Sequence, residues 1–395
     1  MSSADRSIRV LAWSAAARWF RPFSPLMAIY FAQVTGSFAA GMAIISVSLV
    51  AQAVAEVPTG VLADRLGRAS IFRLSAFLSF AAVACFAAAG TVVPGAAALV
   101  AGAVLDGVGL AAASGNEDAL IHDALDAEGR SADYPRQRSR VLSLIETAGF
   151  LSVALGTLLV SGSLTALVVI SLVPSGIAAA LSLAVRSPSP NRHGRQAGRS
   201  PIGESVRALR GDRALISLFS AVVASNVIGG AMWALQPAFY ALFMPLTFVG
   251  PLMSVNYLES ALGFRPSWRA VARFGAERTL FAAEALSRIS ALGALFASAP
   301  WSPFALAASG AGYPPAETAR NAMLMARYPP ASRATAGSLL ALSASLLSAV
   351  VSPLAGALAD RVGITGAMIT MGICLLPTLL VYARLASLPS QSHPR

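Results

Sequence analysis

The sequence contains no lysine, and only 12% of its 395 residues are charged, about half the share of a typical soluble domain. This scarcity of charge excludes an ordinary soluble enzyme. The two cysteines, Cys85 and Cys374, lie inside apolar runs and form no secreted-type disulfide framework. Hydrophobic residues instead make up 56% of the chain, in recurring runs close to the roughly 20 residues that cross a bilayer as a helix.

These apolar runs predict an all-α membrane protein with twelve transmembrane helices in two pseudo-symmetric six-helix bundles. The expected spans are residues 10–33, 40–61, 69–89, 94–121, 140–160, 164–185, 214–237, 246–263, 279–299, 302–325, 334–356 and 363–385. The polar, arginine-rich segment 186–213 is expected to be a cytoplasmic linker, with a short amphipathic helix at 201–210. It separates an N-terminal bundle, 1–185, from a C-terminal bundle, 214–395.

The net charge of +11 is interpreted through topology, because basic residues gather in the cytoplasmic loops of membrane proteins. Nearly all arginines fall in the segments that are cytoplasmic when the N-terminus is inside. The exceptions are Arg18, Arg21, Arg288 and Arg320 within spans and Arg361 in an outer loop. We therefore expect both termini in the cytoplasm and no nucleic-acid partner.

A polar turn, GVLADRLGR at residues 60–68, joins spans 2 and 3. It resembles the loop-2/3 signature of the major facilitator superfamily, written G-x-x-x-D-R-x-G-R. The segment SGNEDALIHDAL at 114–125 resembles the end of span 4 in one bacterial branch of that family, which also carries the E-x-P-T-G preface found at 56–60. The twelve spans and the basic central linker are similar to those of the same family, so that the resemblance covers nearly the whole chain.

The resemblance implies a secondary transporter whose two bundles rock around a site near the middle of the membrane. It also implies that the loop-2/3 signature is a conformational latch at the cytoplasmic face. The expected latch residues are Gly60, Asp64, Arg65, Gly67 and Arg68, with Glu117 or Asp118 and the region of Arg333 as candidate partners.

A second G-x-L-A-D-R-x-G copy lies at residues 356–363 and follows span 11. A true repeat of the signature belongs between spans 8 and 9, where only Gly263 and the arginine content survive. We therefore expect the second copy to be a look-alike in an outer loop, provided that 302–325 is a full span.

Ionisable residues inside a membrane are costly, so each is a functional candidate. Asp106 in span 4 is the main candidate for proton coupling, and a static ion pair with Arg18 or Arg21 is the alternative. Glu146 in span 5 is a second candidate. Glu284 and Arg288 are four residues apart on span 9 and are expected to form a structural pair.

The resemblance implies that spans 1, 4, 7 and 10 line the central cavity. Arg18 and Arg21 of span 1 would then hold an anionic group; alternatively, span 1 begins near Phe23 and both lie at the inner interface. The candidates from spans 7 and 10 are aromatic, amide and charged residues: Asn226, Trp233, Gln236, Tyr313, Arg320 and Asn321.

The sequence therefore predicts a monomeric transporter of a bacterial inner membrane that exports a small amphiphilic molecule, with protons as the coupling ion. One alternative is an organic-anion uptake or exchange carrier, and another is a non-transporting membrane sensor or scaffold. No cofactor or metal is expected: His122 and Asp123 lie at a cytoplasmic helix end, and the chain has only three histidines and no nucleotide-binding or hydrolase motif.

Overall fold

The computed structural model describes residues 2–92, 95–114, 116–130, 133–159, 163–186, 209, 211–327 and 333–387. Throughout these ranges the regular secondary structure is helical. The chain divides into two compact units. Unit 1 comprises Met1–Gly194 with Pro245–Pro251, and unit 2 comprises Arg195–Met244 with Leu252–Arg395. The amphipathic helix expected at 201–210 lies almost wholly outside the described residues.

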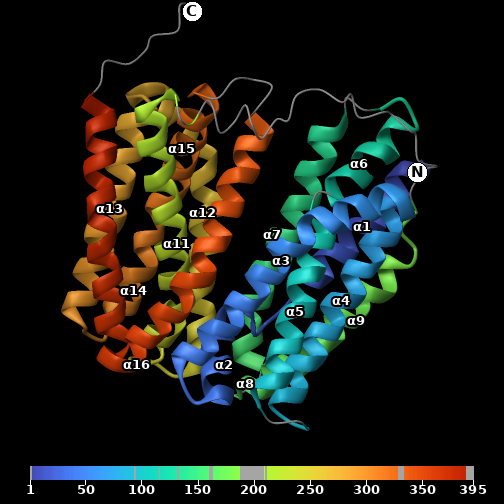
Figure 1. Cartoon of the computed structure of the whole chain (residues 1–395), viewed down its shortest axis with the longest axis horizontal. Helices are drawn as coiled ribbons and strands as arrows, with labels where there is room; N and C mark the ends of the chain where they lie inside the picture. Colours follow the sequence, from blue (N-terminus) through green and yellow to red (C-terminus); the bar gives the residue numbers. More distant parts are fainter. Residues whose placement is uncertain are drawn as a thin grey trace, which may run out of the picture. The chain divides into compact units, whose positions relative to one another are not determined.

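Unit 1 builds its six passes from ten helical segments (Figure 1). These segments are α1 Ser3–Trp19, η1 Ser24–Leu26, α2 Met27–Thr35, α3 Phe38–Leu66, α4 Arg68–Ala89, α5 Ala96–Ala113, α6 Asn116–Asp126, α7 Tyr134–Leu159, α8 Leu164–Ile170 and α9 Leu172–Ser182. The first pass breaks between α1 and η1, at Pro22, since proline lacks the backbone donor that a helix interior needs. The fourth pass was expected as one helix. It consists instead of α5, which is capped by Ser114, and α6.

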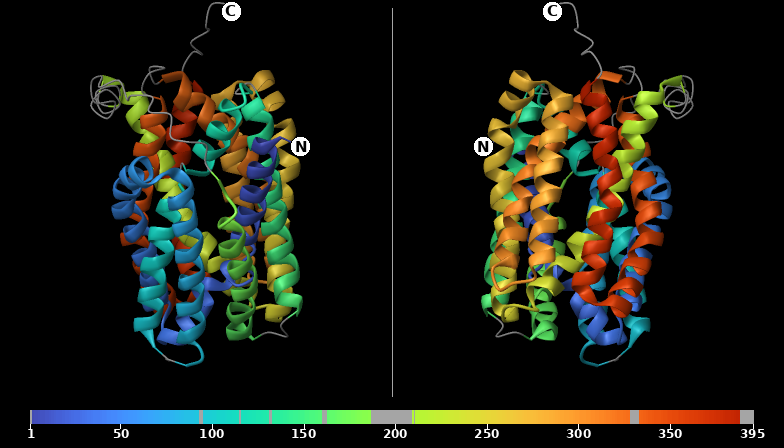
Figure 2. Two further views of the ribbon diagram at one scale, coloured as in Figure 1. Left: turned by 90° about the vertical axis from the view of Figure 1, so that its right-hand side faces the viewer. Right: turned by 90° about the vertical axis from the view of Figure 1, so that its left-hand side faces the viewer.

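Unit 2 also forms six passes, and its helices likewise run side by side (Figure 2). They are α11 Arg213–Tyr240, α12 Leu246–Phe274, α13 Ala276–Ala297, α14 Ser302–Ala308, η3 Ser309–Gly312, α15 Tyr313–Arg327 and α16 Arg333–Ser387. The path from α14 through η3 to α15 is helical without a gap, so 302–325 is a full-length pass. The long α16 contains two passes, because Gly363 has non-helical backbone angles and the chain reverses there.

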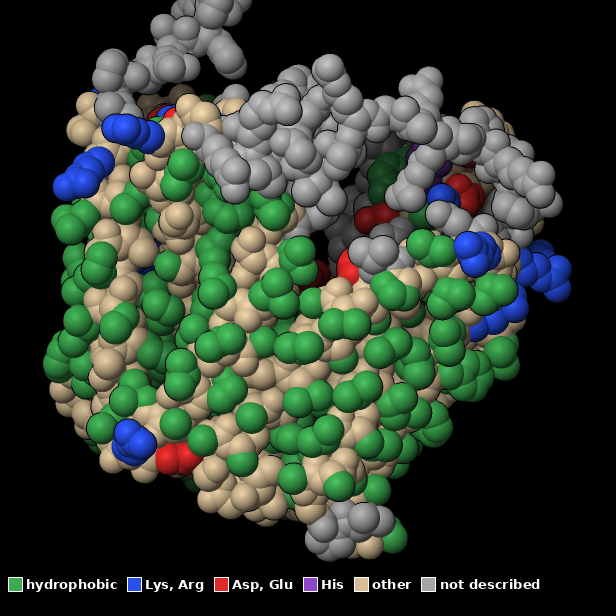
Figure 3. Space-filling model, viewed as in Figure 1, with side chains coloured by type: hydrophobic (Ala, Val, Ile, Leu, Met, Phe, Trp, Pro, Cys, Tyr) green, Lys and Arg blue, Asp and Glu red, His purple; other side chains and the backbone are tan. Residues whose placement is uncertain are grey.

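Seven described segments are both long and apolar enough to span a membrane by themselves. One of them, Leu339–Ser387, turns back at Gly363 and supplies two passes. The remaining passes are interrupted by breaks or carry charged residues, such as the arginines of α1 and α12. On the face drawn in Figure 3, side chains in a broad band are hydrophobic and charged groups gather mainly toward one margin. This distribution fits a protein that spans a bilayer.

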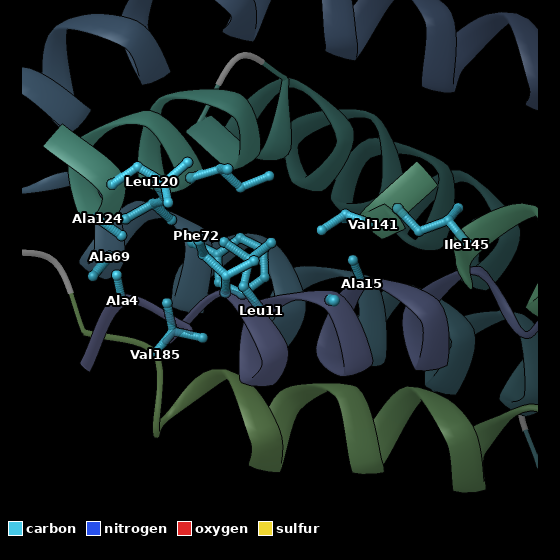
Figure 4. Close-up of a cluster of buried hydrophobic side chains, with 14 residues drawn as sticks. Ala4, Leu11, Ala15, Ala69, Phe72, Leu120, Ala124, Val141, Ile145 and Val185 are labelled. Carbon is cyan, nitrogen blue, oxygen red and sulfur yellow. The ribbon is translucent and has the colours of Figure 1, made fainter. Parts of the chain in front are cut away.

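The core of unit 1 joins helices that are distant in sequence (Figure 4). Leu11 of α1, Phe72 of α4, Leu120 of α6 and Val141 of α7 are all buried there. Elsewhere small residues permit close contact: a Cβ on Gly107 of α5 would meet the carbonyl oxygen of Ser48 on α3 at 2.2 Å. Glycine is therefore required at this crossing, as is common between membrane helices.

Three interhelical turns share one backbone conformation. Gly67, Gly275 and Gly363 have φ/ψ of 90°/138°, 85°/155° and 77°/163°, a region that side chains other than glycine's rarely enter. Gly67 follows α3 and Gly275 follows α12, the second pass of each unit, so Gly275 is the counterpart of Gly67. In the segment between spans 8 and 9, where the sequence kept only Gly263 and the arginine content of the signature, α12 continues eleven residues beyond Gly263 to Phe274, so the glycine of the turn is Gly275.

The second G-x-L-A-D-R-x-G copy ends at Gly363 and forms the same local turn as the first. Within unit 2 its position is different. The chain crosses the unit through α13, returns through α14 and α15, and crosses again in the first part of α16. Gly363 therefore lies at the end of unit 2 opposite to Gly275.

Candidate functional site

Unit 2 contains a cavity of about 610 Å³ bounded by α11, α12, α13, η3, α15 and α16. Most of its lining is uncharged, with aromatic, amide, hydroxyl and glycine residues. The lining includes Ser225, Asn226, Gly229, Gly230, Trp233, Gln236, Asn256, Tyr257, Ser260, Glu284, Ser287, Arg288, Tyr313 and Arg320. A cavity of this size and composition suits a small organic molecule.

Glu284 of α13 is the centre of the charged network at this cavity. Its Oε2 accepts hydrogen bonds from Arg288, one turn along the same helix, at 2.8 and 3.0 Å. Its Oε1 accepts one from Arg320 of α15 at 2.8 Å. All three side chains are at least 89% buried, so the carboxylate compensates two buried guanidinium groups at once.

Further polar groups complete the network. Arg288 also donates to Ser225 at 2.9 Å, to Thr378 and to the carbonyl of Leu375, and its guanidinium lies 5.8 Å from the ring centre of Tyr382. Arg320 in turn donates to Asn226 at 3.1 Å and to Glu317 at 3.0 Å. The two arginines and the two carboxylates balance, so this part of the cavity wall has no net charge.

The structure brings together five of the six residues proposed for the C-terminal part of the site. Asn226, Trp233, Gln236, Tyr313 and Arg320 line the cavity. Asn321 does not, because it is exposed on α15 and donates to Glu317 at 2.9 Å. The expected Glu284–Arg288 pair forms, but sequence reasoning missed that it faces the cavity together with Asn256 and Tyr257 of α12.

Unit 1 keeps its membrane-embedded charges in separate pairs. Arg21 donates to Asp106 of α5 at 2.8 Å, and Arg18 pairs with Glu117 of α6 and donates to Ser75 at 3.3 Å. Arg18 is 5% exposed, and α1 already begins at Ser3. This burial favours the prediction that span 1 includes both arginines. Glu146, the other proton-coupling candidate, is exposed on α7.

Arg68 of the loop-2/3 latch pairs with a residue that was not among the expected partners. Arg68 binds both carboxylate oxygens of Asp123, at 2.7 and 2.8 Å, whereas Glu117 is taken by Arg18. The spacing along α6 explains the difference: Asp123 lies nearly two turns beyond Glu117 and reaches the start of α4. Asp118 makes other contacts, and the side chains of Asp64 and Arg333 lie outside the described residues.

No metal site emerges from the described residues, where no three His, Cys, Asp or Glu side chains gather suitably. His122 packs against the ring of Tyr134, with 5.8 Å between ring centres. The polar groups of the unit 2 cavity and of the ion pairs can bind and orient a ligand and can exchange hydrogen-bond partners.

The sequence profile of the Major Facilitator Superfamily matches residues 10–262, more than half of the chain. The chain belongs to the Major Facilitator Superfamily. Membership makes it a multi-pass membrane transporter and not an enzyme. A comparison with curated proteins finds no match.

Solved structures of this superfamily share the fold. The nucleoside transporter NupG has 16% identity and a TM-score of 0.77, over 97% of this chain and 99% of that one. A bacterial homologue of the human lysosomal transporter Spinster has 14% identity and a TM-score of 0.74, over 98% of both chains. The E. coli fucose:proton symporter FucP has 16% identity and a TM-score of 0.61, over 98% of this chain and 100% of that one. Identities this low show the fold alone.

Proposed function

We propose that this superfamily member is a proton-coupled carrier that exports a small, partly apolar molecule by alternating access, as a monomer in a bacterial inner membrane with both termini cytoplasmic. The buried Arg21–Asp106 pair carries the coupling part of the proposal. Among the described residues Asp106 pairs with Arg21 alone, so a proton can replace Arg21 as its counter-charge. Uptake of the proton adds one positive charge inside unit 1 and releases Arg21, which gives the transport cycle two states.

The cavity of unit 2 supports a partly apolar substrate. Its walls combine Trp233, Tyr257 and Tyr313 with the amides of Asn226 and Gln236. Aromatic rings supply apolar contact area, and a few fixed polar groups orient the ligand. Export as the direction rests on the resemblance of residues 56–60 and 114–125 to drug-efflux-like branches.

The organic-anion alternative loses its main support, because each of the three arginines that suggested it, Arg18, Arg21 and Arg320, has a carboxylate partner. Arg18 and Arg21 pair with Glu117 and Asp106, and Arg288 and Arg320 share Glu284. An anion would have to displace one of these buried carboxylates, which is costly.

Transport in proteoliposomes tests the proposal. The wild-type protein is expected to drive an amphiphile against its gradient when a pH gradient is imposed, and Asp106→Asn is expected to keep substrate exchange but lose that pumping. Glu146→Gln tests the second candidate and is expected to keep the pumping, because Glu146 is exposed and has no described partner. Pumping that ignores the pH gradient would refute the coupling, and absence of exchange for every compound would favour the sensor or scaffold.

A further inference from the structure

A second cavity, of about 410 Å³, lies in unit 1 in the groove between α1 and α7. Part of its lining is apolar, because Ile8, Ala12 and Val141 line it and are buried. The charged residues of the lining are Asp5, Arg9, Arg130, Asp133 and Arg140. The proposed transport mechanism uses none of these residues, so the cavity calls for an explanation of its own.

The acidic part of this cavity surrounds Arg130. Its guanidinium pairs with Asp5 at 3.2 Å and with Asp133 at 3.0 Å. It also pairs with Glu128 at 3.3 Å, so three carboxylates share one guanidinium. This group of four side chains therefore has a surplus of negative charge, and all of them are partly exposed to a ligand.

The basic part of the cavity consists of Arg9 of α1 and Arg140 of α7. Both are exposed, and neither has an ion pair among the described residues. The planar guanidinium group of arginine matches the geometry of a phosphate and binds it through charge-assisted hydrogen bonds. Two such groups, one from each helix, can therefore hold a phosphate in the groove.

The acidic, basic and apolar parts follow one another along both helices. Asp5 lies in the first turn of α1, Arg9 follows it by one turn, and the exposed Trp13 follows Arg9 by another. The same order on α7 is Asp133 directly before the helix, then Arg140, then Leu144. Both helices start beside Arg130, so the groove changes from charged to apolar as it leaves that end.

This order of groups matches a phospholipid at a membrane surface. Tryptophan is typical of the interface, where its ring lies at the level of the headgroups, and a basic pocket between helices suits a lipid phosphate. The acidic part adds a second requirement. A primary ammonium group donates hydrogen bonds to carboxylates, whereas a purely anionic headgroup would be repelled by them.

We propose that the groove between α1 and α7 binds one phospholipid with a primary-ammonium headgroup, of the phosphatidylethanolamine type. Its phosphate lies between Arg9 and Arg140. Its ammonium group faces Asp5 and Asp133, and an acyl chain lies against Trp13. The proposal concerns unit 1 alone and does not depend on the proposed transport function.

Lipid binding to the purified, delipidated full-length protein tests the phosphate site. Dioleoyl-phosphatidylethanolamine is titrated in detergent, and native mass spectrometry measures the affinity of the first bound lipid. Arg9→Gln is expected to weaken binding about tenfold, and Arg9→Gln/Arg140→Gln further, because each variant loses hydrogen bonds to a charged group. Arg6→Gln is the matched control, because Arg6 is exposed on the same helix, has no ion pair among the described residues and does not line the cavity. Equal affinity in the double variant and in wild type overturns the proposal.

Related headgroups test the ammonium site. Dioleoyl-phosphatidylcholine keeps the phosphate but has no N–H donor, and dioleoyl-phosphatidylglycerol has no ammonium group. Both are expected to bind about tenfold more weakly than the phosphatidylethanolamine. Asp133→Asn is expected to reduce the preference for phosphatidylethanolamine over phosphatidylcholine, because it removes one carboxylate. Phosphatidylglycerol binding as tight as that of phosphatidylethanolamine, or an unchanged preference in Asp133→Asn, overturns the assigned headgroup.

A further pair of variants tests the acyl chain. Trp13→Ala removes apolar contact area and is expected to weaken lipid binding at least about fivefold. Trp19→Ala is the control, because Trp19 is also exposed on α1 but does not line the cavity. Glycerophosphoethanolamine, the soluble headgroup without acyl chains, is expected not to compete. Competition by it at the same concentration as the lipid, or equal losses in the two tryptophan variants, overturns a lipid as the occupant.

Discussion

The two units bury their charges to a similar degree but connect them differently. In unit 1, Asp106 and Glu117 each serve one arginine. In unit 2, Glu284 serves both Arg288 and Arg320. The side chains of Asp106 and Glu284 are 10% and 11% exposed, so burial does not separate the two carboxylates. Connectivity does: protonating Asp106 frees one arginine, whereas protonating Glu284 would leave Arg288 without a carboxylate and Arg320 with Glu317. The arrangement in unit 1 suits a group that alternates between two charge states, and the arrangement in unit 2 suits a fixed part of the cavity lining.

The largest expected effect comes from breaking the shared carboxylate. Glu284→Gln leaves Arg288 without its ion partner and Arg320 with Glu317 only. Removing one member of a buried ionic cluster costs about 3–5 kcal/mol, and we expect a value near the upper end. Thermal unfolding of the detergent-purified protein measures it. Glu317→Gln, whose side chain is 27% exposed, is expected to cost less than half as much. Equal losses in the two variants would contradict the central place of Glu284.

Breaking the Arg21–Asp106 pair of unit 1 should destabilise the protein less, and removing its second member should reverse part of the loss. Asp106→Asn leaves Arg21 unpaired and is expected to cost about 3 kcal/mol. The double variant Arg21→Gln/Asp106→Asn removes both charges and should recover more than half of that loss, which a double-mutant cycle by thermal unfolding measures. Additive losses would show that the two residues are not coupled, and the proposed switch would lose its basis.

The sequence predicted some of the residues that line the cavity and missed others. Residues of α11 and α15 were found because charged, amide and aromatic side chains stand out in apolar spans. Asn256 of α12 and Glu284 of α13 were missed, since periodicity does not show which face of a peripheral helix meets a cavity. Fold class followed from apolar runs alone, while the Arg68–Asp123 pair depends on how the helices pack.

The two G-x-L-A-D-R-x-G copies show, for a single turn, that sequence predicts local structure better than position in the fold. Their sequences encode the same glycine conformation, at Gly67 and Gly363, but the rest of the chain decides where each turn lies. Gly275 occupies the place equivalent to Gly67 with ARFGAE around it and no aspartate before the arginine. A short motif therefore predicts local backbone well and topology poorly.

Alanine at the turn glycines separates local conformation from latch function. Gly67→Ala and Gly363→Ala are each expected to cost about 2 kcal/mol, because both put a Cβ into a backbone region that favours glycine. An added Cβ clashes with nothing at either position, so the loss is conformational. Thermal unfolding should give matching losses, whereas proteoliposome exchange should slow more in Gly67→Ala, which adjoins Arg68 and its Asp123 partner. Equal slowing would remove the functional distinction between the copies.

The smallest effect concerns the exposed cluster at the start of α1, where Arg130 pairs with Asp5, Glu128 and Asp133. The hydrogen bond from the Ala4 amide, at 2.9 Å, lowers the pKa of Glu128 from its ordinary 4.5, and Ser2 and then Arg130 lower it further. A lowered pKa stabilises the folded state fully above pH 4.5, and this contribution is lost as the pH falls through the folded value. Thermal unfolding between pH 3 and pH 7 should therefore show that stability falls slightly more steeply with acid in wild type than in Arg130→Gln.

Added salt should shrink this difference in stability, because the groups of the cluster are exposed and screened. The effects of breaking the buried Arg21–Asp106 pair and the Glu284 network should persist in salt. A salt-resistant difference at Arg130 would place this cluster with the buried networks and weaken the contrast between surface and interior charges.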